Sequence, residues 1–172
     1  LPALQDVQFD PGREYSLTWQ SGFAGLAWNK ERIPNGLRTI NDLWNPELKG
    51  KVVVLSEMRD TIGCIMLSQG VDISEQFTDE QFMAGLDVLQ QQVDSGQVKQ
   101  VKGNSYKEDL INEQAWAAIA WSGDIFQINA EEGAKWEFAL PDTGGTLWSD
   151  NLLIPITAAN PKGAQALMDF YY

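Results

Sequence analysis

The sequence of 172 residues contains no histidine and only one cysteine. Histidine is the most common general base and the most common transition-metal ligand, so its absence argues against both kinds of site. The single cysteine, Cys64, allows neither an internal disulfide nor a CxxC motif. Its setting, "TIGCIMLSQG", predicts a small apolar residue packed in a helix. We therefore expect no metal site and no bound cofactor.

Positive charge and long apolar runs are also scarce. The chain has 12 basic against 24 acidic residues, a net charge of −12. Such a surface repels phosphate backbones and anionic lipid, so nucleic acids and membrane surfaces are not expected partners. No apolar run approaches the roughly 18–20 residues of a membrane span, and no signal peptide is recognised. With 44% hydrophobic and 21% charged residues, the composition is typical of a folded globular chain.

Strand and helix patterns alternate along the chain, which indicates an α/β sheet. The residues 14–31 predict two short strands with a break near Ser21–Gly22. The continuous β-branched run "KVVVLSE" predicts a parallel strand that is covered on both faces. Further strands are predicted at 97–102, 114–122, 135–141 and 146–156. Helices are predicted at 39–44, 59–69, 77–96, 105–113, 123–133 and from 160 onward.

Capping signals mark the start of two of these helices. Thr78 and Gln81 form a capping box, followed by apolar residues at helical spacing. These apolar positions are Phe82, Leu86, Leu89 and Val93. Asn160 is the predicted N-cap of the last helix, with Pro161 at its first position.

Carboxylates follow the first buried strand, where ligands of α/β sheets commonly bind. Glu57 and Asp60 are spaced i and i+3, so their carboxylates lie near one another over the first turn of a helix. Acids in this position also cap helices and interact favourably with the helix dipole. Helix capping is therefore the alternative explanation.

Tryptophans mark two further strand ends. Trp121 closes an apolar strand just before Ser-Gly-Asp, and Trp148 and Asp150 follow paired glycines in "GGTLWSD". On a strand, Trp148 and Asp150 point to the same face. The alternatives are core tryptophans, with Asp124 as a helix cap and Asp150 as a turn acid.

Together these strand ends carry two tryptophans and three carboxylates that one sheet could bring to one cleft. Carboxylates attract ammonium groups, and tryptophan faces bind cations with about 0.5–2 kcal/mol each. The same faces bury methylene groups at roughly 0.8 kcal/mol apiece. A polyamine, with amines joined by methylene chains, would use all of these features.

At these motifs the chain resembles the bacterial spermidine/putrescine-binding proteins, the solute receptors of ABC-type polyamine importers. The similar stretches include "INDLWNPELKGKVVVLSEMRDTIG", "AAIAWSGD" and "GGTLWSDNLLIP". The resemblance implies that Glu57, Asp60 and Asp150 hold amines while Trp121 and Trp148 flank the methylene chain, without catalysis. The acid pair is Glu then Asp, whereas the best-known members have Asp then Glu. This departure bears on which polyamine is bound.

The resemblance also implies a type II periplasmic-binding-protein-like fold, with two α/β lobes joined by crossover strands and closing over the ligand. Residues 1–172 then form a single lobe, the second, with a mixed, mostly parallel sheet flanked by helices. The first lobe and the C-terminal segment would be absent, and both ends of the chain would be fragment boundaries. The implied partner is the membrane permease of an ABC transporter. The implied location is extracytoplasmic, either periplasmic or lipid-anchored at the cell surface.

Other functions use some of the same residues. A receptor for another organic cation, such as thiamine or a basic amino acid, would share these groups, and a carbohydrate receptor would share the tryptophans. A hydrolase could use Glu57, Asp60 or Asp150 as an acid/base pair. However, the sequence has no nucleophile elbow, phosphate loop or metal-ligand cluster to support it. The adjacent Tyr171 and Tyr172 suggest a ferric-ion site, but neighbouring helical residues face different ways, so we interpret them as packing residues.

Overall fold

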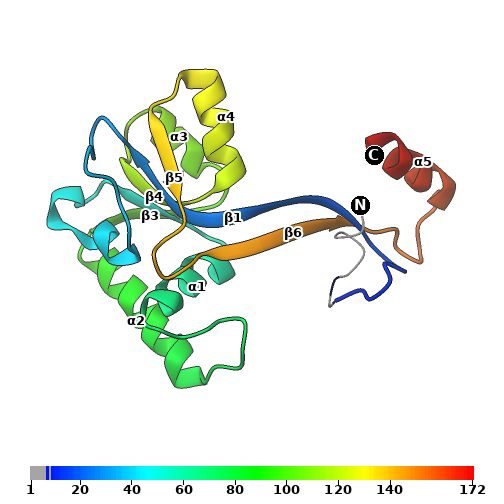
Figure 1. The fold of residues 1–172 in the computed structure, drawn as a ribbon, viewed down its shortest axis with the longest axis horizontal. Coiled ribbons are helices and arrows are strands. Elements are labelled where there is room, and N and C mark those ends of the chain that lie inside the picture. Colours follow the sequence, from blue (N-terminus) through cyan, green and yellow to red (C-terminus); the bar gives the residue numbers. More distant parts are fainter. Residues whose placement is uncertain (1–6, 8) are drawn as a thin grey trace. The chain divides into compact units, whose positions relative to one another are not determined.

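The computed structural model describes residue 7 and residues 9–172, which divide into two compact units (Figure 1). Residues Gly22–Leu147 form one unit, here called the α/β unit. The described residues within Leu1–Ser21, together with Trp148–Tyr172, form the other, here called the terminal unit. Strands β1 (Leu17–Asn29) and β6 (Thr146–Leu152) contribute residues to both. The single lobe expected over residues 1–172 stays a prediction.

The sheet is mixed, as expected, but it is not mostly parallel, because β1 runs antiparallel to both β4 and β5. Its strand order is β3-β2-β4-β1-β5, and β6 pairs with β1. Pairing is parallel on both sides of β2, with β3 and β4, and antiparallel where β1 meets β4 and β5. The remaining strands are β2 (Val52–Leu55), β3 (Val98–Lys102), β4 (Ala117–Trp121) and β5 (Trp136–Ala139).

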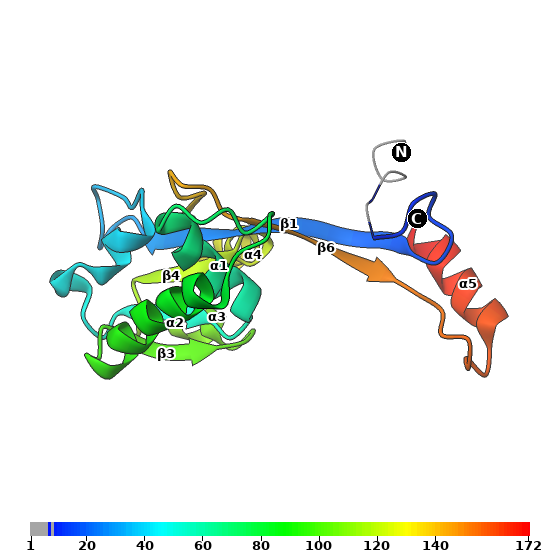
Figure 2. The same cartoon turned by 90° about the horizontal axis from the view of Figure 1, so that it is seen from below.

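Helices cover both faces of this sheet because its parallel connections run in opposite directions. The chain moves from β2 to β3 on one side and then from β3 past β2 to β4. Right-handed crossovers in opposite directions place their helices on opposite faces, and in Figures 1 and 2 α1 and α2 lie across the sheet from α3 and α4. The helices of the α/β unit are η2 (Ile40–Trp44), η3 (Pro46–Leu48), α1 (Met58–Ser68), α2 (Asp79–Asp94), α3 (Tyr106–Ile111) and α4 (Ser122–Glu132).

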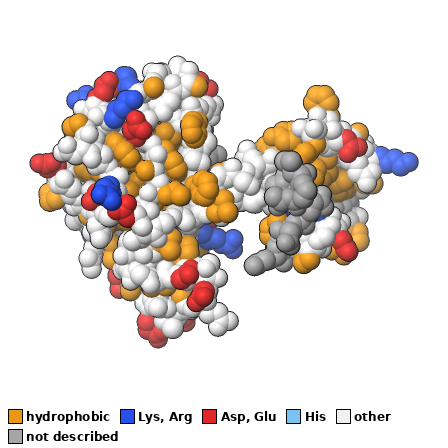
Figure 3. Space-filling model, viewed as in Figure 1, with side chains coloured by type: hydrophobic (Ala, Val, Ile, Leu, Met, Phe, Trp, Pro, Cys, Tyr) orange, Lys and Arg blue, Asp and Glu red, His pale blue; other side chains and the backbone are white. Residues whose placement is uncertain are grey.

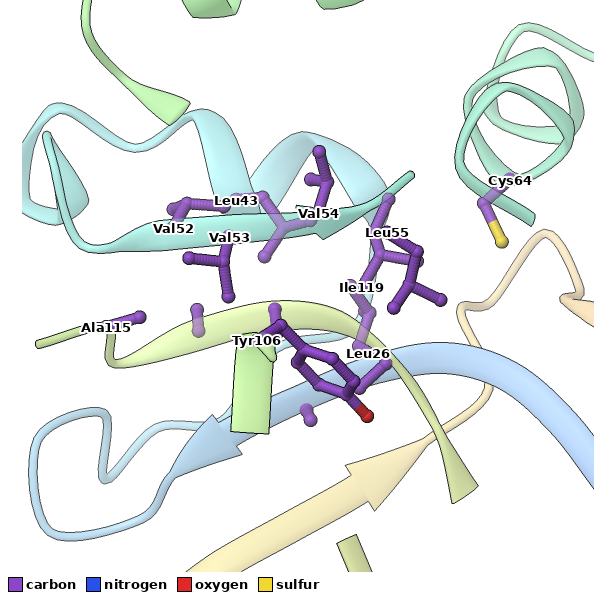
Figure 4. Close-up of a cluster of buried hydrophobic side chains, with 14 of the residues drawn as sticks. Leu26, Leu43, Val52, Val53, Val54, Leu55, Cys64, Tyr106, Ala115 and Ile119 are labelled. Atoms are coloured by element: carbon purple, nitrogen blue, oxygen red, sulfur yellow. The ribbon is translucent and has the colours of Figure 1, made fainter. Parts of the chain in front are cut away.

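The core is centred on β2 and β4. All four residues of β2 are buried, and successive valines point to opposite sides of the strand, as the β-branched run predicts (Figure 4). Each such buried side chain contributes roughly 1.5–3 kcal/mol. Cys64 packs in α1 with no exposed surface, which confirms its predicted role as a small core residue.

The capping predictions are confirmed. Thr78 and Gln81 form the reciprocal capping box at the start of α2. In α5 (Pro161–Tyr171) the side chain of Asn160 accepts a hydrogen bond from the Gly163 backbone N–H at 2.9 Å. Each such cap stabilises its helix by about 1 kcal/mol.

Two local predictions are wrong. β1 is one continuous strand across Ser21–Gly22, and β6 pairs with it; the predicted break coincides instead with the division between the units. β6 ends at Leu152, before Pro155, which cannot donate to a ladder. Val93 lies within α2, as its helical spacing predicts, although it is 39% exposed.

The terminal unit has little interior of its own. No residue of α5 is buried, and its Leu167 and Phe170 are 68% and 88% exposed. Hydrophobic side chains are visible on its surface in Figure 3. Tyr171 contacts the Trp19 ring edge-on at 6.1 Å, and the Tyr172 hydroxyl donates to the Thr18 carbonyl, consistent with the predicted packing role of these tyrosines. Among the described helices, none has the length and apolarity needed to cross a bilayer.

Candidate ligand-binding site

Two strand ends of the α/β unit meet at one edge of the sheet. β2 and β4 are parallel neighbours, with Val52 opposite Ala117, so both carboxyl ends lie on the same side. β2 leads into α1, which carries Asp60, and β4 ends at Trp121. The indole Nε1–H of Trp121 donates a hydrogen bond to Asp60 Oδ2 at 2.7 Å. The structure therefore brings together two of the five predicted site residues.

Asp60 is buried, with 5% of its surface exposed. Its second oxygen, Oδ1, accepts a hydrogen bond from the hydroxyl of Thr146, the first residue of β6. Both carboxylate oxygens of Asp60 thus have partners within the α/β unit. Sequence reasoning missed Thr146, because it lies 86 residues from Asp60 and carries no local signal.

Glu57 occupies the N-cap of α1, as the capping alternative proposed. Its carboxylate accepts a hydrogen bond from the Arg59 backbone N–H at 3.2 Å. Unlike Asp60, its side chain is exposed to solvent. Glu57 therefore offers an accessible carboxylate one helical turn from Asp60, the residue that binds the Trp121 indole.

Tyr106, a fully buried residue of α3, contacts Trp121 through both its hydroxyl and its ring. The Tyr106 hydroxyl accepts the Trp121 backbone N–H at 3.2 Å, and the two rings meet edge-on at 5.9 Å. The same hydroxyl donates to Asp124 Oδ2 at 3.0 Å, and Lys107 pairs with Asp124 Oδ1 at 3.3 Å. Burial, and after it the Asp124 charge, raises the pKa of Tyr106 far above its usual range, so it remains a donor. Asp124 does not cap α4, whose N-cap position is Trp121.

Trp148 and Asp150 lie two residues apart on β6, in the terminal unit. Asp150 is exposed and accepts a hydrogen bond from Gln20 Nε2 at 3.2 Å. Ser149, between them, contacts Ser21 at 3.1 Å. Among the described residues, the Trp148 indole N–H has no hydrogen-bond partner. That these residues converge with Glu57, Asp60 and Trp121 stays a prediction.

The paired glycines before β6 have separate structural reasons. Gly144 has φ +93°, a conformation that side-chain-bearing residues rarely adopt. Gly145 has no room for a side chain. A Cβ added there would lie 2.8 Å from Leu140 Cδ2 and nearer still to the Ala24 carbonyl oxygen of β1. The glycines therefore allow β6 to begin in close contact with β1.

The described residues contain no cluster of histidine, cysteine, aspartate or glutamate side chains that could hold a metal ion. Burial, followed by the nearby Asp60 carboxylate, raises the pKa of the Cys64 thiol to about 12. A thiol with such a pKa is a poor nucleophile at neutral pH. The described part of this edge therefore offers neither a metal-binding cluster nor an activated thiol.

Comparison with known families decides the class of protein. The model of the bacterial extracellular solute-binding protein family matches residues 2–172. The chain belongs to this family. The match covers both units and the candidate site residues of each.

Similar family members are named for polyamines. The chain is 27% identical to the spermidine/putrescine-binding periplasmic protein of Salmonella typhimurium over 173 residues, covering 98% of this chain and 48% of that protein. It is 26% identical to the putrescine/cadaverine-binding protein of Pseudomonas aeruginosa, covering 96% and 49%. The chain thus spans about half the length of the curated relatives it matches.

Solved structures confirm the α/β fold with its mixed, helix-flanked sheet. A Listeria monocytogenes protein, provisionally described as a spermidine/putrescine ABC transporter, superposes with a TM-score of 0.89 and 29% identity, covering 99% of this chain and 52% of that chain. The periplasmic binding protein AfuA of Actinobacillus pleuropneumoniae, with fructose-6-phosphate bound, has a TM-score of 0.72 and 20% identity, covering 99% and 53%. Because this fold also occurs in a sugar-phosphate complex, the ligand must be argued from the site.

Proposed function

We propose that residues 1–172 are the second-lobe part of an extracytoplasmic polyamine receptor, which binds its ligand without chemical conversion. The observation that carries this proposal is the exposed Glu57 carboxylate one helical turn from Asp60, which in turn accepts a hydrogen bond from the Trp121 indole at 2.7 Å. Relatives named for spermidine and putrescine support it. A polyamine offers the ammonium groups that such carboxylates attract and the methylenes that an indole face covers.

Trp148 and Asp150 supply the same pair of groups from β6. Asp150 is exposed, and its hydrogen-bond partner Gln20 is neutral, so this contact leaves the negative charge of the carboxylate uncompensated. Two carboxylates from different segments of the chain, Glu57 and Asp150, suit a ligand with an amine at each end. A carbohydrate would use the tryptophans but has no cationic groups to match these acids.

The two-lobed receptor architecture explains the exposed surface of the terminal unit. Its helix α5 leaves the large apolar side chains of Leu167 and Phe170 uncovered. In the proposed receptor, the other lobe covers this helix and closes over the ligand by a hinge motion. The closed receptor then presents the ligand to a membrane permease of an ABC transporter.

The test is titration calorimetry of the full-length receptor with spermidine, putrescine, thiamine and maltose. We expect micromolar or tighter binding of a polyamine. Asp150→Asn should lower the affinity by about 30-fold or more, because truncating one partner of a desolvated charge pair costs roughly 2–5 kcal/mol. Trp148→Ala should also weaken binding. Ser149→Ala is the matched control, since its hydroxyl contacts Ser21 and alternates with the two site residues on β6.

Different ligands would point to different receptors. Heat from thiamine alone would retain the cationic site and reject polyamines as its ligand. Heat from maltose alone would mean that the tryptophans are sugar platforms, and the proposal would be wrong. The 172-residue chain by itself should bind polyamines weakly or not at all, because the other lobe contributes part of the site and hinge closure.

A further inference from the structure

We infer that Asp60 is a positioning residue, which orients Trp121 and anchors the start of β6, and that it does not bind the ligand amine itself. This inference rests on the proposed polyamine-binding function. It separates Asp60 from Glu57, although the two acids are three residues apart and have the same predicted role.

Asp60 and Glu57 differ in their access to solvent. Asp60 is 5% exposed, whereas Glu57 three residues earlier is exposed. An ammonium group needs direct access to a carboxylate oxygen to form a hydrogen-bonded ion pair. Glu57 provides that access at this edge of the sheet, and Asp60 does not.

Each oxygen of Asp60 already accepts a hydrogen bond from a donor of the protein. Oδ2 accepts the Trp121 indole N–H at 2.7 Å, and Oδ1 accepts the Thr146 hydroxyl. Hydrogen bonds to an ionised acceptor are about twice as strong as neutral ones. A carboxylate oxygen can accept a second hydrogen bond, but Asp60 is only 5% exposed, so an ammonium group could reach it only by moving one of these donors, and a buried donor left unpaired is unfavourable.

The hydrogen bonds to Asp60 hold Trp121 and Thr146 in place. Trp121 is fixed at its indole nitrogen by Asp60, and at its backbone N–H and ring edge by Tyr106. A side chain fixed in this way loses little freedom when a ligand arrives, which favours affinity. Thr146 is the first residue of β6, the strand that also carries Trp148 and Asp150. Asp60 therefore links Trp121, at the end of β4, to Thr146, at the start of β6.

The carboxamide variant separates the two roles. In Asp60→Asn the amide oxygen can still accept the Trp121 indole N–H, and the amide NH2 can donate to the Thr146 hydroxyl, which can rotate to accept it. The shape and both hydrogen bonds are kept, but the negative charge is lost. In Asp60→Ala both hydrogen bonds and the charge are lost. Glu57→Gln is the matched control, in which an accessible charge is removed without a change of shape.

Putrescine affinities of the full-length receptor and its variants give the first readout. We expect Asp60→Ala to lower the affinity about 30-fold and Asp60→Asn to restore it to within about threefold of the unmodified receptor. We expect Glu57→Gln to lower it about 30-fold. If Asp60→Asn lost as much affinity as Glu57→Gln, Asp60 would be a direct amine ligand and the inference would be overturned.

The second readout needs no ligand. The Trp121 indole N–H resonance, assigned by its disappearance in Trp121→Phe, should lie downfield, as expected for an N–H bonded to a carboxylate. This resonance should keep a downfield, hydrogen-bonded chemical shift in Asp60→Asn and move upfield in Asp60→Ala. An unchanged resonance in Asp60→Ala would refute the link. If Asp60→Ala did not fold, an unbonded Trp121 resonance in Asp60→Asn would refute it instead.

The two proposals fail in different ways. If the unmodified receptor bound no polyamine, the proposed function would be wrong, while the indole resonance would still report on the Asp60–Trp121 link. If the unmodified receptor bound polyamine but Asp60→Asn did not recover the affinity lost in Asp60→Ala, the function would stand and the positioning role would be wrong.

Discussion

Replacing Gly145 by alanine should destabilise the protein more than any effect of backbone conformation would explain. The added Cβ would lie 2.8 Å from Leu140 Cδ2, a contact that a leucine rotation can relieve. It would lie nearer still to the Ala24 carbonyl oxygen, which cannot move without displacing β1. Overpacking costs typically 1–3 kcal/mol, and we expect about 3 kcal/mol here because the obstacle is backbone.

Two other glycines isolate the cause. Gly144 has φ +93° but no atom within 4 Å of an added methyl group, so Gly144→Ala should cost only the conformational strain of about 1–2 kcal/mol. Gly123, in the first turn of α4, has neither a positive φ nor a neighbour within 4 Å. Gly123→Ala should stabilise the protein by about 0.5 kcal/mol, because alanine has less freedom to lose on folding.

Urea and thermal unfolding, monitored by far-UV circular dichroism, measure the stability of all three variants. For a chain of this size about 3 kcal/mol corresponds to a melting temperature roughly 6–12 °C lower. From most to least stable, we expect the order Gly123→Ala, unmodified protein, Gly144→Ala, Gly145→Ala. A Gly145→Ala protein as stable as Gly144→Ala would refute the argument that β1 and β6 pack too closely there for a side chain.

Three further outcomes follow from the α/β unit. Despite its burial, Asp109 has a lowered pKa, because Lys102 and Lys99 donate hydrogen bonds to its carboxylate. Its contribution to the free energy of unfolding should be complete above about pH 4 and be lost as the pH falls through the lowered folded-state pKa. The stability measured by urea unfolding should therefore fall less steeply at acid pH in Asp109→Asn, and an unchanged pH dependence would contradict this. Cys64, fully buried and with its pKa raised to about 12, should react with a thiol reagent only after unfolding; prompt reaction in the folded state would mean that α1 opens readily. Thr78→Ala removes one half of the capping box and should lower the free energy of unfolding by about 1 kcal/mol, whereas no change would show that α2 does not depend on its cap.

Local features of the fold could be predicted because their causes lie within a few residues. The capping box of α2 depends on Thr78 and Gln81, and the burial of β2 follows from its unbroken run of β-branched side chains. The predicted break in β1 was wrong, because this strand pairs with strands far away in the chain, β6 among them. Val93 has the helical spacing of a core residue, but nothing in its own helix decides whether another element covers it.

The sequence by itself determined the family, the α/β class and the residue types of the candidate site, since these depend on the order and chemistry of short motifs. Only the tertiary structure decided how two similar acids differ. Glu57 caps α1 and faces solvent, whereas Asp60 is buried between Trp121 and Thr146, which are 61 and 86 residues away. The physical reason is that the accessibility of a carboxylate, and the donors that reach it, depend on chain segments that only folding brings together.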